Sequence, residues 1–227
     1  MQIRTSQKQM SESFWTITFL TLSGGFQDAY TYFSRGKVFA NAQTGNMVLM
    51  AANVIEGNIS GFLRYLFPVL AFSLGIVCAA CIKNRVKTIS LHWRQSVMLV
   101  ELVLLLITPF IQLDYLANSL VSFACAMQLQ SFRKVHGYPF ASTMCIGNLR
   151  SGLDCLVSSF ETNDPAKRHR AFQYFRIILT FIIGAGLGKW ACDGFGRFAI
   201  WGSVLLLLFS WVLMFLDPTP SIPLEEE

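Results

Sequence analysis

Long apolar blocks separated by short polar links are the feature that most constrains how this chain can fold. Several blocks approach the ~20 residues that an α-helix needs to cross ~30 Å of hydrocarbon. Hydrophobic residues make up 53% of the 227 residues and charged residues only 14%, against roughly a quarter charged in soluble domains. The sequence therefore predicts an all-α, polytopic membrane helix bundle. The apolar segments are 14–33, 38–55, 65–82, 97–111, 116–132, 140–160, 172–190 and 198–216.

The second and sixth segments differ from the others because they open with glycine, amide and hydroxyl residues, at 39–46 and 140–148. Backbone that breaks at such residues cannot face lipid and needs protein or a wet cavity around it. We therefore predict six full spans plus two broken or re-entrant segments. Eight full crossings remain the alternative.

The distribution of Lys and Arg favours the six-span arrangement. If both polar segments re-enter, eleven basic residues lie on the N-terminal side and four on the other, which fits the positive-inside rule with both termini cytoplasmic. If all eight segments cross, the asymmetry is small. The eleven are Arg4, Lys8, Lys83, Arg85, Lys87, Arg94, Arg133, Lys134, Lys167, Arg168 and Arg170, and the four are Arg35, Lys37, Arg64 and Arg197. Because these charges sit in links rather than on one face with aromatics, nucleic-acid binding is not expected.

An internal repeat relates the two halves. The Phe-Ala and Gly-Asn pairs of 39–46 recur in 140–148 with one inserted residue, and 25–28 and 72–75 align with 128–131 and 181–184. Three full crossings in each half give the halves opposite orientations, an arrangement that recurs in secondary transporters. Eight crossings would give parallel repeats. The predicted organisation is a cytoplasmic tail (1–13), two membrane halves (14–111 and 112–216) and an acidic, Pro-rich tail (217–227).

The two Gly-Asn pairs carry the predicted binding site. Asn is a favoured N-cap, so we expect helices to start after each pair, at Met47 and Leu149, with their positive ends toward a shared pocket for an anionic or polar solute. The alternative is that the pairs pack a tight helix crossing and bind nothing. The candidate lining residues are Asn41, Gln43, Thr44, Gly45, Asn46, Thr143, Gly147 and Asn148.

Charged residues inside apolar segments are the next candidates, since an intramembrane charge is costly. Asp28 is a candidate proton or cation site, or a carboxylate solvated near the external interface. Arg150 either pairs with Asp154, one turn away, or helps to hold an anion. Glu101 lies about one turn inside the fourth segment and is expected to reach cytoplasmic water, and Arg176 marks the start of the seventh span.

Motifs for catalysis, cofactors or metals are not found. The chain has no nucleophile elbow, Walker motif or paired catalytic carboxylates, so we do not expect an enzyme. Cys78 and Cys81 have CxxC spacing but lie in an apolar run, which favours helix packing over redox or metal chemistry. The run 184–188 has glycines four apart, which indicates close helix packing.

The first-half motif resembles a known family. Gly24-Gly25-Phe26-Gln27-Asp28-Ala29, followed by Phe39-Ala40-Asn41 and Thr44-Gly45-Asn46, is similar to the signature of the YoaK-type bacterial inner-membrane proteins. The resemblance runs from about 14 to 216. In the second half, that family usually has Gly-x-Gln-Asn and Thr-Gly, where this chain has 128–131 and Ile146-Gly147. The resemblance implies a bacterial cytoplasmic membrane location and supplies no substrate.

The leading hypothesis from the sequence is a small secondary transporter or permease for a small polar or anionic solute. Its partners would be the lipid bilayer and that solute, and the size of the chain is compatible with a homodimer. The second hypothesis is a non-transporting membrane scaffold or assembly factor, in which the polar segments only join helices.

Overall fold

The computed structural model describes residues 14–85, 93–132, 134–135, 138–139, 143 and 145–215. The predicted tails 1–13 and 217–227 lie outside these residues, as does the start of the sixth apolar segment at 140–142. The described chain is almost entirely helical, which confirms the all-α prediction. Its α-helices are α1 (Phe14–Ser34), α2 (Gln43–Ile55), α3 (Ile59–Arg85), α4 (Trp93–Ile107), α5 (Asp114–Ser131), α6 (Cys145–Thr162), α7 (Pro165–Phe195) and α8 (Ile200–Leu213).

Short elements complete the chain. The 3₁₀ turns η3 (Thr108–Phe110) and η4 (Gly196–Ala199) follow α4 and α7, and β1 (Lys134–Val135) pairs antiparallel with β2 (Tyr138–Pro139). Pro109 and Gly196 occupy the two 3₁₀ turns. The ring of Pro109 removes a backbone donor, and Gly196 has a φ of 54°, a conformation that glycine adopts at little cost.

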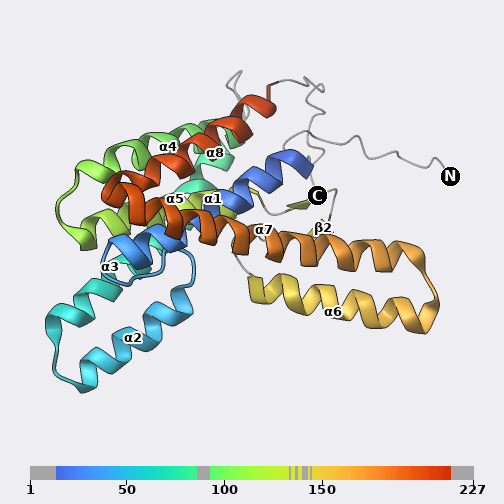
Figure 1. Cartoon of the computed structure of the whole chain (residues 1–227), viewed down its shortest axis with the longest axis horizontal. Coiled ribbons are helices and arrows are strands. Elements are labelled where there is room, and N and C mark those ends of the chain that lie inside the picture. Colours follow the sequence, from blue (N-terminus) through green and yellow to red (C-terminus); the bar gives the residue numbers. More distant parts are fainter. Residues whose placement is uncertain are drawn as a thin grey trace.

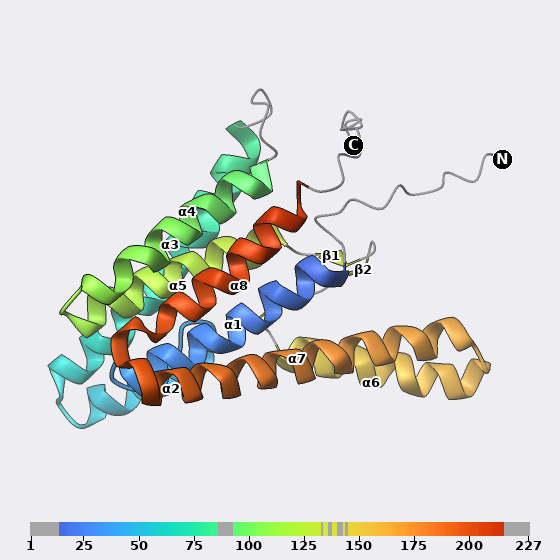
Figure 2. The ribbon, with the colours of Figure 1, turned by 45° about the horizontal axis from the view of Figure 1, so that its top comes forward.

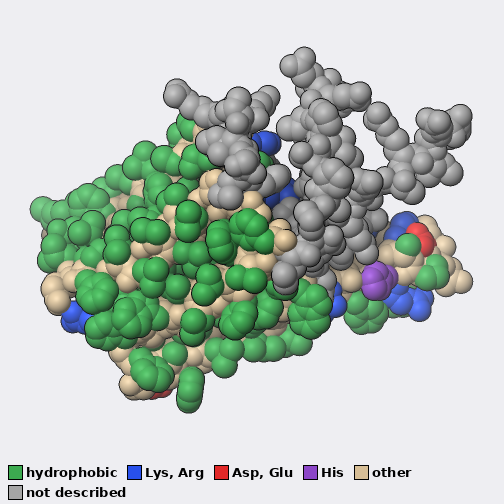
Figure 3. Space-filling model, turned by 90° about the horizontal axis from the view of Figure 1, so that it is seen from above, with side chains coloured by type: hydrophobic (Ala, Val, Ile, Leu, Met, Phe, Trp, Pro, Cys, Tyr) green, Lys and Arg blue, Asp and Glu red, His purple; other side chains and the backbone are tan. Residues whose placement is uncertain are grey.

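Within the described ranges, three helical segments are long and apolar enough to cross a membrane: Ile59–Lys83, Trp93–Phe110 and Pro165–Leu213. The last contains both α7 and α8. Large apolar side chains are exposed on every described α-helix, and they cover most of the bundle on the face seen in Figure 3. Soluble monomers rarely expose contiguous apolar surface of this kind. These features fit a membrane protein.

The helices form a bundle with two hairpins that extend from it (Figures 1 and 2). In the bundle, α1 packs against α7 and α8, α5 packs against α3 and α4, and α4 meets α8. One hairpin is α2 with the start of α3, and the other is α6 with the start of α7. The main buried apolar cluster joins α1, α4, α5 and α8, with Leu20, Met98, Val121 and Leu207 among its fully buried members.

Small residues set the closest helix crossings. A Cβ on Gly25 of α1 would lie 2.9 Å from the backbone nitrogen of Ala185, and one on Gly188 of α7 would lie 2.8 Å from the carbonyl oxygen of Phe26. Such distances leave no room for a side chain, so the two backbones touch. A Cβ on Gly184 would likewise lie 2.8 Å from the backbone of Leu22, whereas Gly186, between Gly184 and Gly188, faces open space. The prediction that 184–188 packs a helix crossing is confirmed.

Candidate functional site

A buried polar network lies where α1 meets α4, α5 and α8. Gln27 of α1 is fully buried, and its amide nitrogen Nε2 lies 2.9 Å from Ser23 Oγ, 3.0 Å from Ser203 Oγ and 3.3 Å from Glu101 Oε1. The two serine hydroxyls are 2.7 Å apart. Ser23 lies one helical turn before Gln27, so both side chains share the face of α1 that meets α8. The network therefore joins residues from both halves of the chain.

Glu101 is the residue of this network whose position the sequence analysis predicted wrongly. It was expected to reach water, but its side chain is fully buried. Because α4 begins at Trp93, Glu101 is two turns inside the helix, on the face that meets α1. Among the described residues, its second oxygen, Oε2, has no hydrogen-bond partner. A polar residue within an apolar helix could have indicated a buried polar contact. Glu101 in α4 and its partner Gln27 in α1 both have this feature.

Cys125 of α5 joins this network beside Asp28. Its thiol donates to Oε1 of Gln27, the residue that precedes Asp28 in α1. Asp28 accepts a 2.7 Å hydrogen bond from the backbone N–H of Asn41. Two buried carboxyl groups, Asp28 and Glu101, thus lie at neighbouring positions around α1, one bonded to Gln27 and the other to the Asn41 backbone.

The link between α1 and α2 turns back along α1 to reach Asp28. The backbone N–H of Asn41 donates to Asp28, and its side-chain amide donates to the carbonyl of Gly24, 3.3 Å away. Gly24 lies ten residues before the end of α1 at Ser34, a rise of about 15 Å along the helix. The backbone around Asn41 therefore lies well inside the length of α1.

Asn46 holds this link closed. It is fully buried; its Oδ1 accepts from the N–H of Phe39 at 3.0 Å, and its Nδ2 donates to the Phe39 carbonyl at 2.7 Å and to Gln43 Oε1 at 2.8 Å. The amide of Gln43 donates to the carbonyl of Ala40 at 2.7 Å. These side chains bind the chain's own backbone, whereas Thr44 in the same turn is exposed.

The predicted starts of α2 and α6 are wrong by four residues. α2 begins at Gln43 with Ala42 as its N-cap residue, and α6 begins at Cys145, so each Gly-Asn pair lies in the first helical turn. Asn46 is accordingly not an N-cap. Its side chain bonds to Phe39, which precedes the helix, while Gly45 and Asn46 themselves have helical backbone.

The second polar segment is arranged differently. Thr143 and Asn148 are buried, but Gly147 is exposed and Arg150 forms an exposed pair with Asp154, with 3.9 Å between Nε and Oδ2. α6 packs along α7 and extends away from the bundle (Figure 1). Its first residue, Cys145, nevertheless has its thiol within electrostatic range of Asp28. Both helix starts thus approach the Asp28 region.

Arg35, predicted as a loop charge, is a buried connector. Its guanidinium donates to Tyr30 Oη (2.8 Å), to the carbonyls of Ile111 (2.8 Å) and Thr108 (3.1 Å), and to Asp114 Oδ1 (3.2 Å). The side chain is 2% exposed. It fastens the end of α1 to the link between α4 and α5.

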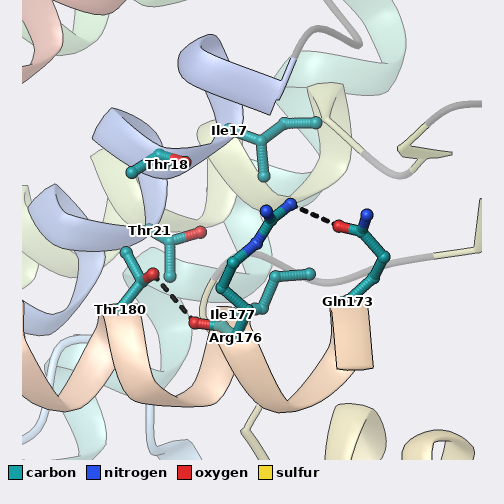
Figure 4. Close-up of a pocket in the computed structure, with 7 residues that line it drawn as sticks. All are labelled: Ile17, Thr18, Thr21, Gln173, Arg176, Ile177 and Thr180. Carbon is teal, nitrogen blue, oxygen red and sulfur yellow. Dashed lines mark hydrogen bonds between the residues drawn. The ribbon is translucent and has the colours of Figure 1, made fainter. Parts of the chain in front are cut away.

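A further polar position lies between α1 and α7 (Figure 4). Arg176 of α7 donates to Gln173 on its own helix and turns toward Thr18 and Thr21 of α1 across a cavity of about 10 Å³. That volume is about enough for one water molecule. Thr21 is fully buried, whereas Arg176 is itself exposed, and its place at the start of the seventh span stays a prediction.

The network consists of hydrogen-bonding and ionisable side chains. No group of three or more His, Cys, Asp and Glu side chains among the described residues is placed to hold a metal ion, and the described cysteines are all free. Two carboxyl groups joined by amides, hydroxyls and a thiol can accept or donate hydrogen bonds to a polar solute, and each can bind a proton.

Comparisons with known proteins place the chain in a family. Neither curated proteins nor solved structures gave a match. A family model matches residues 16–213, which include the buried network and both polar segments. The chain therefore belongs to the family described as Protein of unknown function (DUF1275).

Proposed function

We propose that this protein is a small secondary transporter or permease of a bacterial cytoplasmic membrane, which moves a small polar or anionic solute past the network of Gln27, Glu101, Cys125 and Asp28. The observation that carries the proposal is that network. Charged groups in a membrane interior are costly and mark solute or proton paths. Here two carboxyl groups lie in the centre of the bundle, and both halves of the chain contribute to their surroundings.

An inverted repeat is part of the proposal, with α1–α4 equivalent to α5–α8. The helix contacts support it, because they are preserved when the halves are exchanged: α1 with α7 corresponds to α5 with α3, and α1 with α8 to α5 with α4. Equivalent helices also run in opposite directions. Arg35 O accepts from Asn118 and Leu20 O accepts from Gln128, which makes α1 and α5 antiparallel, as inverted repeats require.

The same relation holds between α4 and α8. The indole of Trp201 donates to the carbonyl of Leu106, and that of Trp211 donates to the carbonyl of Gln95. Residues late in α8 therefore meet residues early in α4. Parallel repeats, which eight full crossings would give, would instead align the two helices in one direction.

Six spans with re-entrant α2 and α6 fit the path of the chain. α3 runs parallel to α5, because the contacts Phe67–Tyr115 and Gly75–Ala126 advance along both helices in the same direction. Since α5 is antiparallel to α1, α3 is antiparallel to α1 as well. The segment between α1 and α3 then leaves and returns on one side of the membrane. It enters as the extended link to Asn41 and exits as α2, whose 13 residues span only about 20 Å.

The experiment tests whether the network ever meets water. In a variant whose only cysteine is Cys125, thiol labelling by a small membrane-impermeant reagent is measured in intact cells and in inverted vesicles. A transporter must open its site, so Cys125 reacts from at least one side, and Glu101→Gln changes the ratio of the two labelling rates. Asp28→Asn in the same background tests the second carboxyl group.

Two single-cysteine controls report sidedness. Asn58→Cys lies in the turn between α2 and α3, and Lys167→Cys lies near the turn between α6 and α7. Three crossings separate them if there are six spans, so they label from opposite sides. With eight full crossings four helices separate them, and both label from the same side, which would reject the proposed topology.

A membrane scaffold is the second candidate, favoured by the way Asn46 and Gln43 bind the chain's own backbone. In a scaffold the polar network is permanent helix-to-helix packing. Cys125 then stays unreactive from both sides while the two controls label, and Glu101→Gln changes nothing but stability. That pattern would reject transport.

A further inference from the structure

A cavity of about 440 Å³ opens at the end of the bundle where α1 ends and where α3 and α5 begin. That volume is in the range of small-ligand sites. It is separate from the Asp28 and Glu101 network. Its walls combine charged, polar and aromatic side chains: Gly36, Ser60, Arg64, Phe67, Asp114 and Tyr115.

The cavity carries one charge of each sign from different helices. Arg64 belongs to α3 and is exposed, and Asp114 is the first residue of α5 with a side chain 54% exposed. Arg35 donates to Oδ1 of Asp114. The other oxygen, Oδ2, lies near Gly36, since a Cβ added to Gly36 would be 4.0 Å from it. A ligand with a cation and an anion a few ångströms apart suits this pair.

Beside the charged pair and Ser60, the cavity has aromatic walls and continues onto an exposed apolar surface. The rings of Phe67 and Tyr115 pack with centroids 5.6 Å apart, and tyrosine is favoured at membrane interfaces. From the cavity, an exposed row runs along α3 at helical spacing. Its members are Leu63, Phe67, Leu70, Leu74 and Val77.

We infer that this cavity binds the headgroup of a zwitterionic phospholipid that bears a primary ammonium. The phosphate lies at Arg64, the ammonium donates to Asp114 and the Ser60 hydroxyl, and one acyl chain follows the apolar row on α3. The row argues for a lipid rather than a free solute, because the cavity opens onto apolar surface at the expected membrane interface. Asp114 argues for a zwitterion over an anionic headgroup, since it repels a second negative charge.

The test is a lipid competition followed by native mass spectrometry. The full-length protein is exposed to equal amounts of phosphatidylethanolamine, phosphatidylcholine and phosphatidylglycerol with identical acyl chains. Wild type retains phosphatidylethanolamine about fivefold over each of the others, as one charge-assisted hydrogen bond allows. Arg64→Gln lowers its retention about fivefold on the same grounds, and Arg64→Lys restores most of it. Arg197→Gln, at the same end of the bundle and outside the cavity, leaves retention unchanged.

Three results would overturn the inference. Equal retention of the three lipids by wild type would remove the headgroup selectivity, and unchanged retention in Arg64→Gln would place the lipid elsewhere. Displacement by free phosphoethanolamine at the same concentration as the lipid would assign the cavity to a soluble zwitterion. None of these results bears on transport, which the labelling of Cys125 tests separately.

Discussion

The two polar segments that interrupt the apolar pattern, 39–46 and 140–148, have similar sequences, but the described residues in and beside them lie in different surroundings. In the first, Asn41 and Asn46 bind backbone and α1 side chains and are buried. In the second, Gly147 is exposed and Arg150 contacts an exposed Asp154. The first segment is held against the bundle, whereas α6 leaves it along α7.

The partner helix explains the difference. α1 offers Asp28 as an acceptor for the Asn41 N–H. The repeat alignment pairs Asp28 with Ser131 of α5, and the Ser131 hydroxyl donates to Met127 in its own helix at 2.8 Å. In α1 the aligned position thus accepts a hydrogen bond from the link, whereas in α5 the aligned hydroxyl bonds within its own helix.

The largest expected effect comes from the arginines that flank the two segments. Arg35→Gln removes a buried guanidinium with four bonds and leaves Asp114 and two carbonyls without their donor. Asp114 is half exposed and can be solvated, but each buried carbonyl left without its donor costs about 1–3 kcal/mol, so we expect a loss of about 2–4 kcal/mol. Arg150→Gln breaks only an exposed pair, worth about 0–1 kcal/mol. Thermal unfolding of the detergent-purified variants measures both, and equal losses would contradict the comparison.

A smaller effect is expected at the asparagine that closes the first segment. Asn46→Ala leaves the N–H and carbonyl of Phe39 unpaired, and each buried unpaired group costs about 1–3 kcal/mol, so we expect a loss of about 2–3 kcal/mol. Thr44→Ala, in the same turn but exposed, changes stability by less than about 0.5 kcal/mol. The same unfolding assay applies. If Asn46→Ala matched Thr44→Ala, the Phe39 bonds would not be what fastens the link.

The positions of the helices were predictable from the sequence, and the contents of the site were only partly so. Apolar runs locate the helices because a membrane helix needs apolar side chains along its whole length. The segment predicted at 116–132, for example, is α5, Asp114–Ser131. Glu101 is buried because α4 turns it toward Gln27, and Arg35 is buried because it bonds to carbonyls such as that of Thr108. In both cases the partner lies far away in the chain. No local pattern encodes such contacts.

The smallest effect tests the comparison most directly, because it changes the same residue in both segments. Alanine in place of a helical glycine gains about 0.5–1 kcal/mol of helix propensity. At Gly147 a new Cβ meets nothing within 4 Å, so Gly147→Ala should stabilise the protein by that amount. At Gly45 the Cβ would lie 3.2 Å from the Phe39 ring, which stacks on Tyr32 with centroids 4.8 Å apart and so has little freedom to move.

The gain at Gly45 is therefore offset, and Gly45→Ala should be neutral or destabilising by up to about 1 kcal/mol, the lower end of the cost of overpacking. The two variants should change the midpoint of thermal unfolding in opposite directions, or only Gly147→Ala should raise it. Equal stabilisation by both would mean that Phe39 does not pack on the first turn of α2. The packing inferred for the first segment would then be wrong, and with it the role assigned to Asp28 as its anchor.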